Sequence, residues 1–225
     1  MTRVLDRRRA FELRKLGNSY SQIKKELGIS KSTLSLWLRQ YPLSKEQIRL
    51  LRDISESRIE KYRQTMQRKR DTKLLDYYNE QKKILLPFAK KELYIAGLFL
   101  YWGEGDKTSR NVVSINNTDP GVLKFALHWM TKALDIPKEK IQVYLHLYSD
   151  MVIEDEINYW SRELYVPKNQ FAKPYIKQSK RIELDHKGFG HGTCGIRAFN
   201  TVIKERILMG IKSVVDYSNG KIPHF

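Results

Sequence analysis

The alternation of apolar and polar residues between positions 7 and 41 predicts three short helices around one small core. The segments are RRRAFELRKLG, SYSQIKKELG and SKSTLSLWLRQY, with turns at Gly17-Asn18 and Gly28-Ile29. Apolar residues recur every three or four positions, the interval that gathers them on one face of a helix. The residues expected to fill this core are Leu13, Leu16, Tyr20, Ile23, Leu27, Ile29, Leu34, Trp37 and Leu38.

Polar residues at the expected helix starts support these boundaries. Ser19 and Gln22 fit a capping box, and Ser30 fits the N-cap of the third helix. Their side-chain oxygens can accept hydrogen bonds from the first backbone N–H groups of a helix, which have no partner within it. Gly28 suits a turn that needs a positive φ angle.

The following stretch is polar and basic, and it contains neither Pro nor Gly before Pro87. A second capping box, from Ser44 to Gln47, opens it, and its apolar residues recur at mostly helical intervals. One long helix, or two broken near Asp71, is expected, and a helix of 40 residues would span about 60 Å. Three roles are open for it: a spacer lying along DNA, a dimerising coil, or a solvated helix packed on the second domain by one stripe.

From Glu92 onward the pattern alternates between helical and strand periods. Helices are expected at 94–101, 121–134, 154–164 and 201–217, and strands at 111–117, 140–148, 173–181 and 192–197. This order predicts an α+β domain with helices packed on one face of a mixed or antiparallel sheet. The expected organisation is a three-helix domain at 1–43, a basic helical connector at 44–91 and an α+β domain at 92–225.

Charge is distributed unevenly along the 225 residues, which carry a net charge of +17. Residues 1–91 contain 24 Lys and Arg against 10 Asp and Glu, whereas residues 92–225 contain 18 against 15. Because phosphate binding scales with the cations that a protein presents, the first part is expected to bind double-stranded DNA. The alternative is that these cations are ordinary residues of solvated helix surfaces.

Composition excludes several other classes of protein. The chain is 41% hydrophobic, which supplies a buried core and argues against wholesale disorder. No apolar run approaches the roughly 18 to 20 residues that cross a bilayer, and the first residues lack the apolar block of a signal peptide. We therefore expect a cytoplasmic protein without a membrane partner, associated with the nucleoid if the source is bacterial.

The three-helix segment resembles the helix-turn-helix of resolvases and bacterial repressors. Gly in the turn, an apolar residue after it and a Leu-x-x-Trp-Leu stripe carry this resemblance, with Lys31–Gln40 as the recognition helix. The resemblance implies that Lys31, Ser32, Thr33 and Ser35 face the major groove, and that Arg39 and the run Arg7, Arg8 and Arg9 contact phosphates. A helical dimerisation or protein-binding module is the alternative.

The last domain resembles the LAGLIDADG homing-endonuclease domain over roughly residues 92–218. The resemblance is carried by Ile95-Ala-Gly-Leu-Phe-Leu-Tyr-Trp-Gly-Glu-Gly-Asp106, by Ser114-Ile-Asn-Asn-Thr-Asp-Pro120 and by a helix ending at Leu134-Asp-Ile. In that family two such helices pack across a dyad through small residues. The acid at each C-terminal end enters a shared metal site over the scissile phosphates.

The resemblance implies a role for each matching residue. Glu104 would be the catalytic acid and a Mg²⁺ ligand, Asp106 a second ligand, and Lys177 or Lys180 the basic residue of a later strand. A carboxylate at the negative end of a helix dipole favours a compensating cation, and Mg²⁺ would also activate water. One motif supplies half of a symmetric site, so a nuclease of this kind must be a homodimer.

The motif departs from the family in its register. Counting from Ala96-Gly97-Leu98 places the acid at Trp102, two residues before Glu104, and a register set by Glu104 places Phe99 where the family prefers Gly. These departures favour a second hypothesis, a helix-turn-helix transcriptional regulator whose related domain binds DNA without cleaving it. A third hypothesis is a scaffold protein with a basic tail.

Two further groups of residues contain types that occur in binding sites. His186, His191 and Cys194 lie within nine residues, but no fourth ligand is evident and the intervening glycines favour a loop, so zinc is not expected. Tyr144 and Tyr148 are expected to contribute to packing rather than to base stacking.

Overall fold

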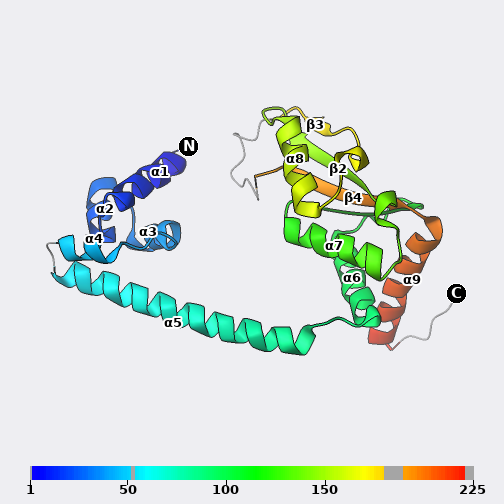
Figure 1. Cartoon of the computed structure of the whole chain (residues 1–225), viewed down its shortest axis with the longest axis horizontal. Helices are drawn as coiled ribbons and strands as arrows, with labels where there is room; N and C mark the ends of the chain where they lie inside the picture. Colours follow the sequence, from blue (N-terminus) through cyan, green and yellow to red (C-terminus); the bar gives the residue numbers. More distant parts are fainter. Residues whose placement is uncertain (1, 52–53, 180–189, 221–225) are drawn as a thin grey trace. The chain divides into compact units, whose positions relative to one another are not determined.

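The computed structural model describes residues 2–51, 54–179 and 190–220. They form two compact units, Met1–Leu86 and Pro87–Phe225 (Figure 1). The finer boundary expected at residue 43 stays a prediction. In the part of the chain that the structure describes, no helix is both long and apolar enough to cross a lipid bilayer.

The first unit is entirely helical. Its elements are α1 (Thr2–Lys15), α2 (Tyr20–Leu27), α3 (Lys31–Leu38), α4 (Lys45–Leu50) and α5 (Ile54–Leu85). The first three helices enclose the expected small core, which contains the buried side chains of Ala10, Leu13, Tyr20, Ile23, Leu34 and Leu38. The prediction of a three-helix module is therefore confirmed.

The capping predictions are also confirmed. Ser19 accepts a hydrogen bond from the backbone of Gln22, whose side chain accepts one from the backbone of Ser19 at 2.7 Å. Ser30 caps α3 in the same position, and Gly28 ends α2 with φ of 70°. Local sequence thus determines where these helices begin and end.

One member of the predicted core is wrong, because Leu16 is 77% exposed. Helix α1 ends at Lys15, and the chain then turns at Gly17 with φ of 92°. The helical spacing therefore stops at Lys15 and does not predict the direction of the Leu16 side chain.

The connector contains one long helix, and the alternative of a break near Asp71 is wrong. Asp71 lies inside the 32-residue helix α5, which is about 48 Å long at 1.5 Å per residue. The break comes earlier, where α4 ends and Leu51 adopts an extended conformation with ψ of 117°. From residue 68 to residue 86 every side chain of this segment is exposed.

The second unit mixes helices with a four-stranded sheet. Its elements are α6 (Lys90–Glu104), β1 (Val112–Asn117), α7 (Pro120–Lys132), the 3-10 turn η1 (Lys138–Lys140), β2 (Gln142–Tyr148), α8 (Ile153–Leu164), the 3-10 turn η2 (Lys168–Gln170), β3 (Tyr175–Lys177), β4 (Thr193–Phe199) and α9 (Thr201–Ser218). The predicted order of helices and strands is confirmed.

The strands lie in the order β1-β4-β2-β3. Strand β4 pairs antiparallel with both β1 and β2, while β2 and β3 are parallel, so the sheet is mixed. Two boundaries differ from expectation. Residues 138–140 form a 3-10 turn, so β2 begins at Gln142 instead of Lys140, and β3 covers only Tyr175–Lys177 of the strand expected at 173–181. Lys180 lies outside the described residues.

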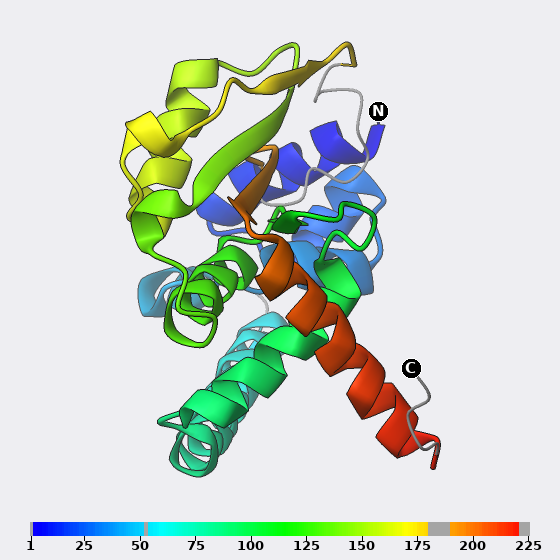
Figure 2. The ribbon, with the colours of Figure 1, turned by 90° about the vertical axis from the view of Figure 1, so that its right-hand side faces the viewer.

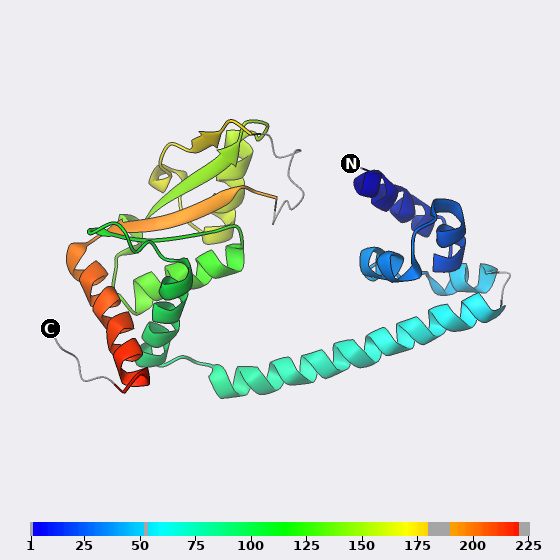
Figure 3. The same cartoon turned by 180° about the vertical axis from the view of Figure 1, so that it is seen from behind.

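Helices cover one face of this sheet. Val143 and Leu145 of β2 pair with Ile196 and Cys194 of β4, and all four side chains are buried on that face. Helices α7 and α8 lie over it in Figure 1, and the view from behind in Figure 3 shows the opposite face without a helix across it. Alternate residues of β2 on this opposite face remain partly exposed.

The small residue Gly97 of α6 lies against Trp129 of the same chain. A Cβ atom at Gly97 would lie 2.0 Å from Cδ1 and Nε1 of Trp129 in α7. The large indole ring of Trp129 occupies the space beside Gly97, so this glycine allows a close contact between α6 and α7. Figure 2 shows α9 crossing α6, and Gly210 of α9 faces Leu98 at that contact.

We predict that Gly97→Ala lowers the free energy of unfolding of the second unit by about 3 kcal/mol, because the new methyl group overpacks the contact with Trp129. Urea unfolding followed by tryptophan fluorescence measures this change. Gly103→Ala is the matched control on the same helix, since its Cβ would meet no atom within 4 Å. Equal stability of the two variants would contradict the packing described for Gly97.

Candidate functional site

Helix α3 is anchored by one side and exposes the other. Leu34 and Leu38 are fully buried in the three-helix core. Of the five residues expected to face DNA from this segment, Lys31, Ser32 and Arg39 are exposed, while Thr33 and Ser35 are partly buried. The side chains of Lys31 and Arg39 form no hydrogen bond or ion pair with residues that the structure describes, so both cations are available to a ligand.

The hydroxyl groups at the start of α3 are held in fixed positions. The Ser30 hydroxyl accepts a hydrogen bond from the backbone N–H of Thr33 at 3.2 Å. It also lies 2.8 Å from the hydroxyls of Ser32 and Thr33. A hydroxyl can donate once and accept twice, so these groups keep hydrogen-bonding capacity for a further partner.

The arginine run of α1 is partly engaged by acidic neighbours. Arg8 lies 3.8 Å from Glu12, and Arg9 lies 3.2 Å from Glu12 and 3.4 Å from Glu26. Arg7 lies over the ring of Phe11. Exposed ion pairs contribute little free energy, so these arginines can exchange their carboxylate partners for phosphates at small cost.

Sequence reasoning missed Leu36, which is 71% exposed near the middle of α3. It lies two positions from Leu34 and two positions from Leu38, and a step of two positions turns a helix by about 200°. The buried stripe of α3 therefore already indicated that Leu36 points away from the core. A helical projection of the sequence would have found it.

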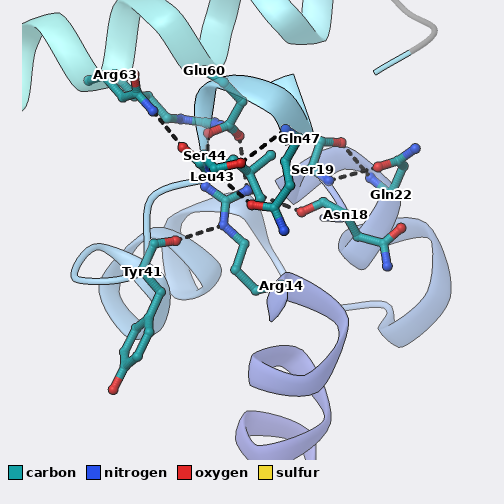
Figure 4. A network of polar contacts seen from close by, with 11 residues as sticks. Arg14, Asn18, Ser19, Gln22, Tyr41, Leu43, Ser44, Gln47, Glu60 and Arg63 are labelled. Carbon is teal, nitrogen blue, oxygen red and sulfur yellow. Dashed lines mark hydrogen bonds and ion pairs between the residues drawn. The ribbon is translucent and has the colours of Figure 1, made fainter. Parts of the chain in front are cut away.

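A buried ion pair holds the three-helix module to α5. The Arg14 guanidinium donates to both carboxylate oxygens of Glu60, at 2.8 and 3.3 Å, and both side chains are almost fully buried. It also donates to the carbonyl oxygens of Tyr41 and Asn18, at 3.0 and 3.1 Å. Figure 4 shows the guanidinium between these acceptors, with Arg63 on the far side of Glu60.

An aromatic ring closes this network. Tyr20 of α2 lies beneath the guanidinium groups of Arg14 and Arg63, at 4.5 and 4.2 Å from the ring centroid. Burial raises the pKa of the Tyr20 hydroxyl, although the charge of Arg14 opposes this shift. The Gln64 side chain of α5 adds to this attachment by donating to the carbonyl oxygen of Leu43, while the Gln47 side chain ties α4 to the carbonyl oxygen of Lys15. The start of α5 is thus a rigid part of the module.

In the second unit, Glu104 is the last residue of α6 and its side chain is exposed. Its carboxylate forms no hydrogen bond or ion pair with the described residues. The chain beyond it joins the sheet, because Gly105 forms a bridge with Ile115 and the backbone N–H of Asp106 donates to Ser114. Glu104 therefore lies at the β1 edge of the sheet.

Gly105 allows this close approach. A Cβ atom there would lie 2.5 Å from the carbonyl oxygen of Tyr101 and 2.6 Å from its ring. Asp106 then caps the following turn, because one carboxylate oxygen accepts from the backbone N–H groups of Thr108 and Ser109 at 2.8 and 3.2 Å. Burial acts to raise the pKa of Asp106, but the hydrogen bonds from Ser109 and Thr108 outweigh it and lower this pKa.

A buried lysine holds this turn from inside. Lys204 of α9 is fully buried, and its ammonium group donates to the backbone carbonyl of Asp106 and, at 2.6 Å, to the hydroxyl of Tyr101. The Tyr101 hydroxyl donates to the same carbonyl oxygen. Burial lowers the pKa of Lys204, with the carboxylate of Asp106 opposing this shift. The position of the α6 end is thus fixed by groups from two helices.

The structure does not bring Lys177 to Glu104 within one chain. Lys177 lies on β3, at the sheet edge opposite β1, three strand spacings or about 14 Å away. Its predicted catalytic role stays a prediction. Lys107 is the nearer exposed cation, and its ammonium group lies 3.0 Å from the carbonyl oxygen of Gly105.

The open face of the sheet is aromatic and basic, and the four described strands contain no Asp or Glu. Arg197 donates to Gln142 at 2.8 Å and lies over the ring of Tyr144. Lys177 lies over the ring of Tyr148 in the same manner. Both tyrosines are partly exposed on the side without helices, and the expectation that they contribute to packing rather than to base stacking stays a prediction.

Within the described residues, the candidate zinc cluster of His191 and Cys194 does not form a metal site. Cys194 is buried on the core face of β4, and burial raises the pKa of its thiol. The His191 ring instead lies 2.8 Å from a carboxylate oxygen of Glu156 and stacks on Tyr159. His186 lies outside the described residues, and no group of three metal-ligating side chains occurs among those described.

Comparison with known families identifies the first module. A family model described as a homeodomain-like domain matches residues 1–46. The module is a helix-turn-helix. This match covers α1 to α3 and the start of α4, and it suggests sequence-specific DNA binding. No curated protein and no solved structure matches the chain.

We predict that Glu60→Gln lowers the free energy of unfolding of the first unit by about 3 kcal/mol, because it leaves the buried charge of Arg14 without its partner. Thermal unfolding followed by circular dichroism measures the loss. Glu12→Gln is the control, since the carboxylate of Glu12 forms only exposed ion pairs and its loss should cost less than about 1 kcal/mol. Equal costs for the two variants would contradict the role given to the Arg14–Glu60 pair.

Proposed function

We propose that the chain is a sequence-specific DNA-binding protein whose helix α3 enters the major groove. The observation that supports this proposal most strongly is the exposed face of α3 within a homeodomain-like module. The sequence from residue 27 to residue 45 contains no Asp or Glu, so nothing on α3 or its flanking turns repels phosphate. The major groove of DNA admits a single helix, and each base pair there presents a distinct pattern of groups.

Each exposed group of the module has a role in this proposal. Lys31, Ser32 and Ser35 face base edges, with Thr33 held beside them by Ser30. Arg39 and the run Arg7 to Arg9 contact phosphates, which fixes the orientation of the module on the duplex. The exposed cations Arg68, Lys69, Arg70 and Lys73 of α5 extend the phosphate-binding surface beyond the module.

Selection from a randomised duplex library tests sequence-specific binding directly. The wild-type chain is expected to enrich one sequence at physiological salt. Recovery of bound duplex without any preferred sequence would contradict the proposal.

Arg39→Ala is expected to weaken binding to all duplexes alike, because it removes a phosphate contact. The slope of log affinity against log salt concentration should fall by about 1. Lys168→Ala is the matched control, since this exposed lysine pairs with Glu154 in the second unit. Fluorescence anisotropy across a salt series measures both variants, and an unchanged slope for Arg39→Ala would remove this residue from the interface.

A second candidate function, cleavage of the bound duplex, is favoured by the position of Glu104. Its exposed carboxylate lies at the edge of a sheet whose open face carries Arg197 and Lys177, and the four described strands contain no carboxylate. A duplex on this face would bring phosphates close to that acid. The second unit resembles a single-motif homing endonuclease, which would cleave DNA with a divalent metal.

The donor groups fit Mg²⁺ in part. Mg²⁺ keeps several waters and needs only one or two carboxylates in addition to phosphate oxygens. Glu104 supplies one free carboxylate, and Asp106 supplies one oxygen beyond that used in its turn. A bound Mg²⁺ would supply an activated water and neutralise charge on the leaving oxygen. Lys204 and Tyr101 hold the backbone that presents both acids.

A symmetric double-strand cut requires two copies of Glu104, and we propose that α6 forms the contact between them. Its outward face carries Ile95, Phe99 and Trp102, which are 37, 51 and 45% exposed. These residues are spaced four and three positions apart, so they form one apolar stripe. A homodimer through this stripe would bury it.

The alternative is a transcriptional regulator that binds DNA without cleaving it. The separation of Lys177 from Glu104 favours this alternative, because one chain does not place the predicted lysine beside the predicted acid.

Cleavage assays separate the two functions. We expect wild-type protein to cut a selected duplex with Mg²⁺ but not with a chelator, and Glu104→Gln to lose more than about a hundredfold in rate while binding equally well. Glu139→Gln, which alters an exposed acid of η1, is the control and should cut normally. If wild-type protein binds the duplex and leaves it intact with Mg²⁺, the regulator is the correct function.

A further inference from the structure

We infer that Leu36 reads a thymine in the target sequence through the 5-methyl group of that base. The inference rests on the proposed function, since it requires that α3 lies in the major groove. It adds the chemical identity of one target base pair, which the charges of the module do not determine.

The first observation is the exposure of an apolar side chain at the centre of the binding face. Leu36 is 71% exposed, with its backbone fixed by Leu34 and Leu38 in the core. Ser32 lies one turn before it and Arg39 about one turn after it, and residues three or four apart share a helix face. Leu36 therefore lies between a polar group and a cation on the surface that faces the duplex.

The second observation is what surrounds this side chain. The hydroxyls of Ser32 and Thr33 are gathered around Ser30 at the start of the helix. Ser35 and Trp37 on either side of it are partly buried, so Leu36 is the exposed side chain in the middle of α3. Cations at Lys31 and Arg39 flank it, with no acid between residues 27 and 45. This charge pattern fits a polyanion better than it fits an apolar protein partner.

The third step is the chemistry of the groove. Thymine is the one base of unmodified DNA that presents a methyl group in the major groove, and apolar side chains recognise it by contact. A leucine there cannot form the hydrogen bonds that the other base edges require, and it would leave their donors and acceptors without partners. Leu36 therefore favours thymine by attraction and disfavours exposed polar edges.

Removal of the methyl group from the DNA tests this contact without changing the protein. A duplex selected by the full-length chain is compared with duplexes in which each thymine in turn is replaced by deoxyuridine. At one position the wild-type affinity should fall about fourfold, the value expected for losing contact with one methyl group. Fluorescence anisotropy measures each affinity.

Leu36→Ala tests the protein side of the same contact. It should bind the thymine duplex about four- to tenfold more weakly and should not distinguish thymine from deoxyuridine at that position. Leu16→Ala is the matched control, because Leu16 is equally exposed in the same module but lies outside α3. This variant should bind as the wild type does and keep the fourfold preference.

Two results would overturn the inference. If no deoxyuridine substitution changes the wild-type affinity, the protein reads no thymine methyl group, even though it prefers one sequence. Equal deoxyuridine penalties in the wild type and in Leu36→Ala would show that another residue reads it, or that Leu36 contacts a protein. Binding without any preferred sequence would instead remove the proposed function together with this inference.

Discussion

The buried pair between Arg14 and Glu60 is the constraint on which the DNA-binding module depends. The three helices share only a small core, and the pair connects them to a helix that starts about 40 residues later. A buried ion pair adds little net stability compared with an apolar contact, because both charges lose their hydration. It does fix the orientation of the three helices on α5. The Arg14 side chain donates four hydrogen bonds, to Glu60, Tyr41 and Asn18, and one arrangement of these segments satisfies all of them.

A similar principle organises the end of α6 in the second unit. Lys204 and Tyr101 both donate to the backbone carbonyl of Asp106, and Gly105 permits the chain to approach the sheet. These contacts hold the backbone and leave the carboxylate of Glu104 exposed. In both units, therefore, buried polar groups fix a segment whose exposed side chains are available to a ligand.

The elements of the fold followed from local sequence, whereas the contacts that position the sites did not. Capping residues such as Ser19 and Ser30 act within one turn, so their effect can be predicted from neighbouring residues. The partners of Arg14 and Gly97 lie 46 and 32 positions away, and no periodicity indicates them. The prediction that Leu16 is buried was wrong because a helical repeat does not continue past the end of a helix. The exposure of Leu36 can be predicted from its spacing of two positions from both buried leucines of α3, Leu34 and Leu38.

Chemical footprinting on a selected duplex tests the central claim, that α3 lies in the major groove, most directly. Dimethyl sulfate methylates guanine N7 in the major groove and adenine N3 in the minor groove. Binding of the chain should protect guanine N7 within one compact site and leave adenine N3 there reactive. Protection of adenine N3 alone, or of neither position while the duplex is bound, would contradict the account.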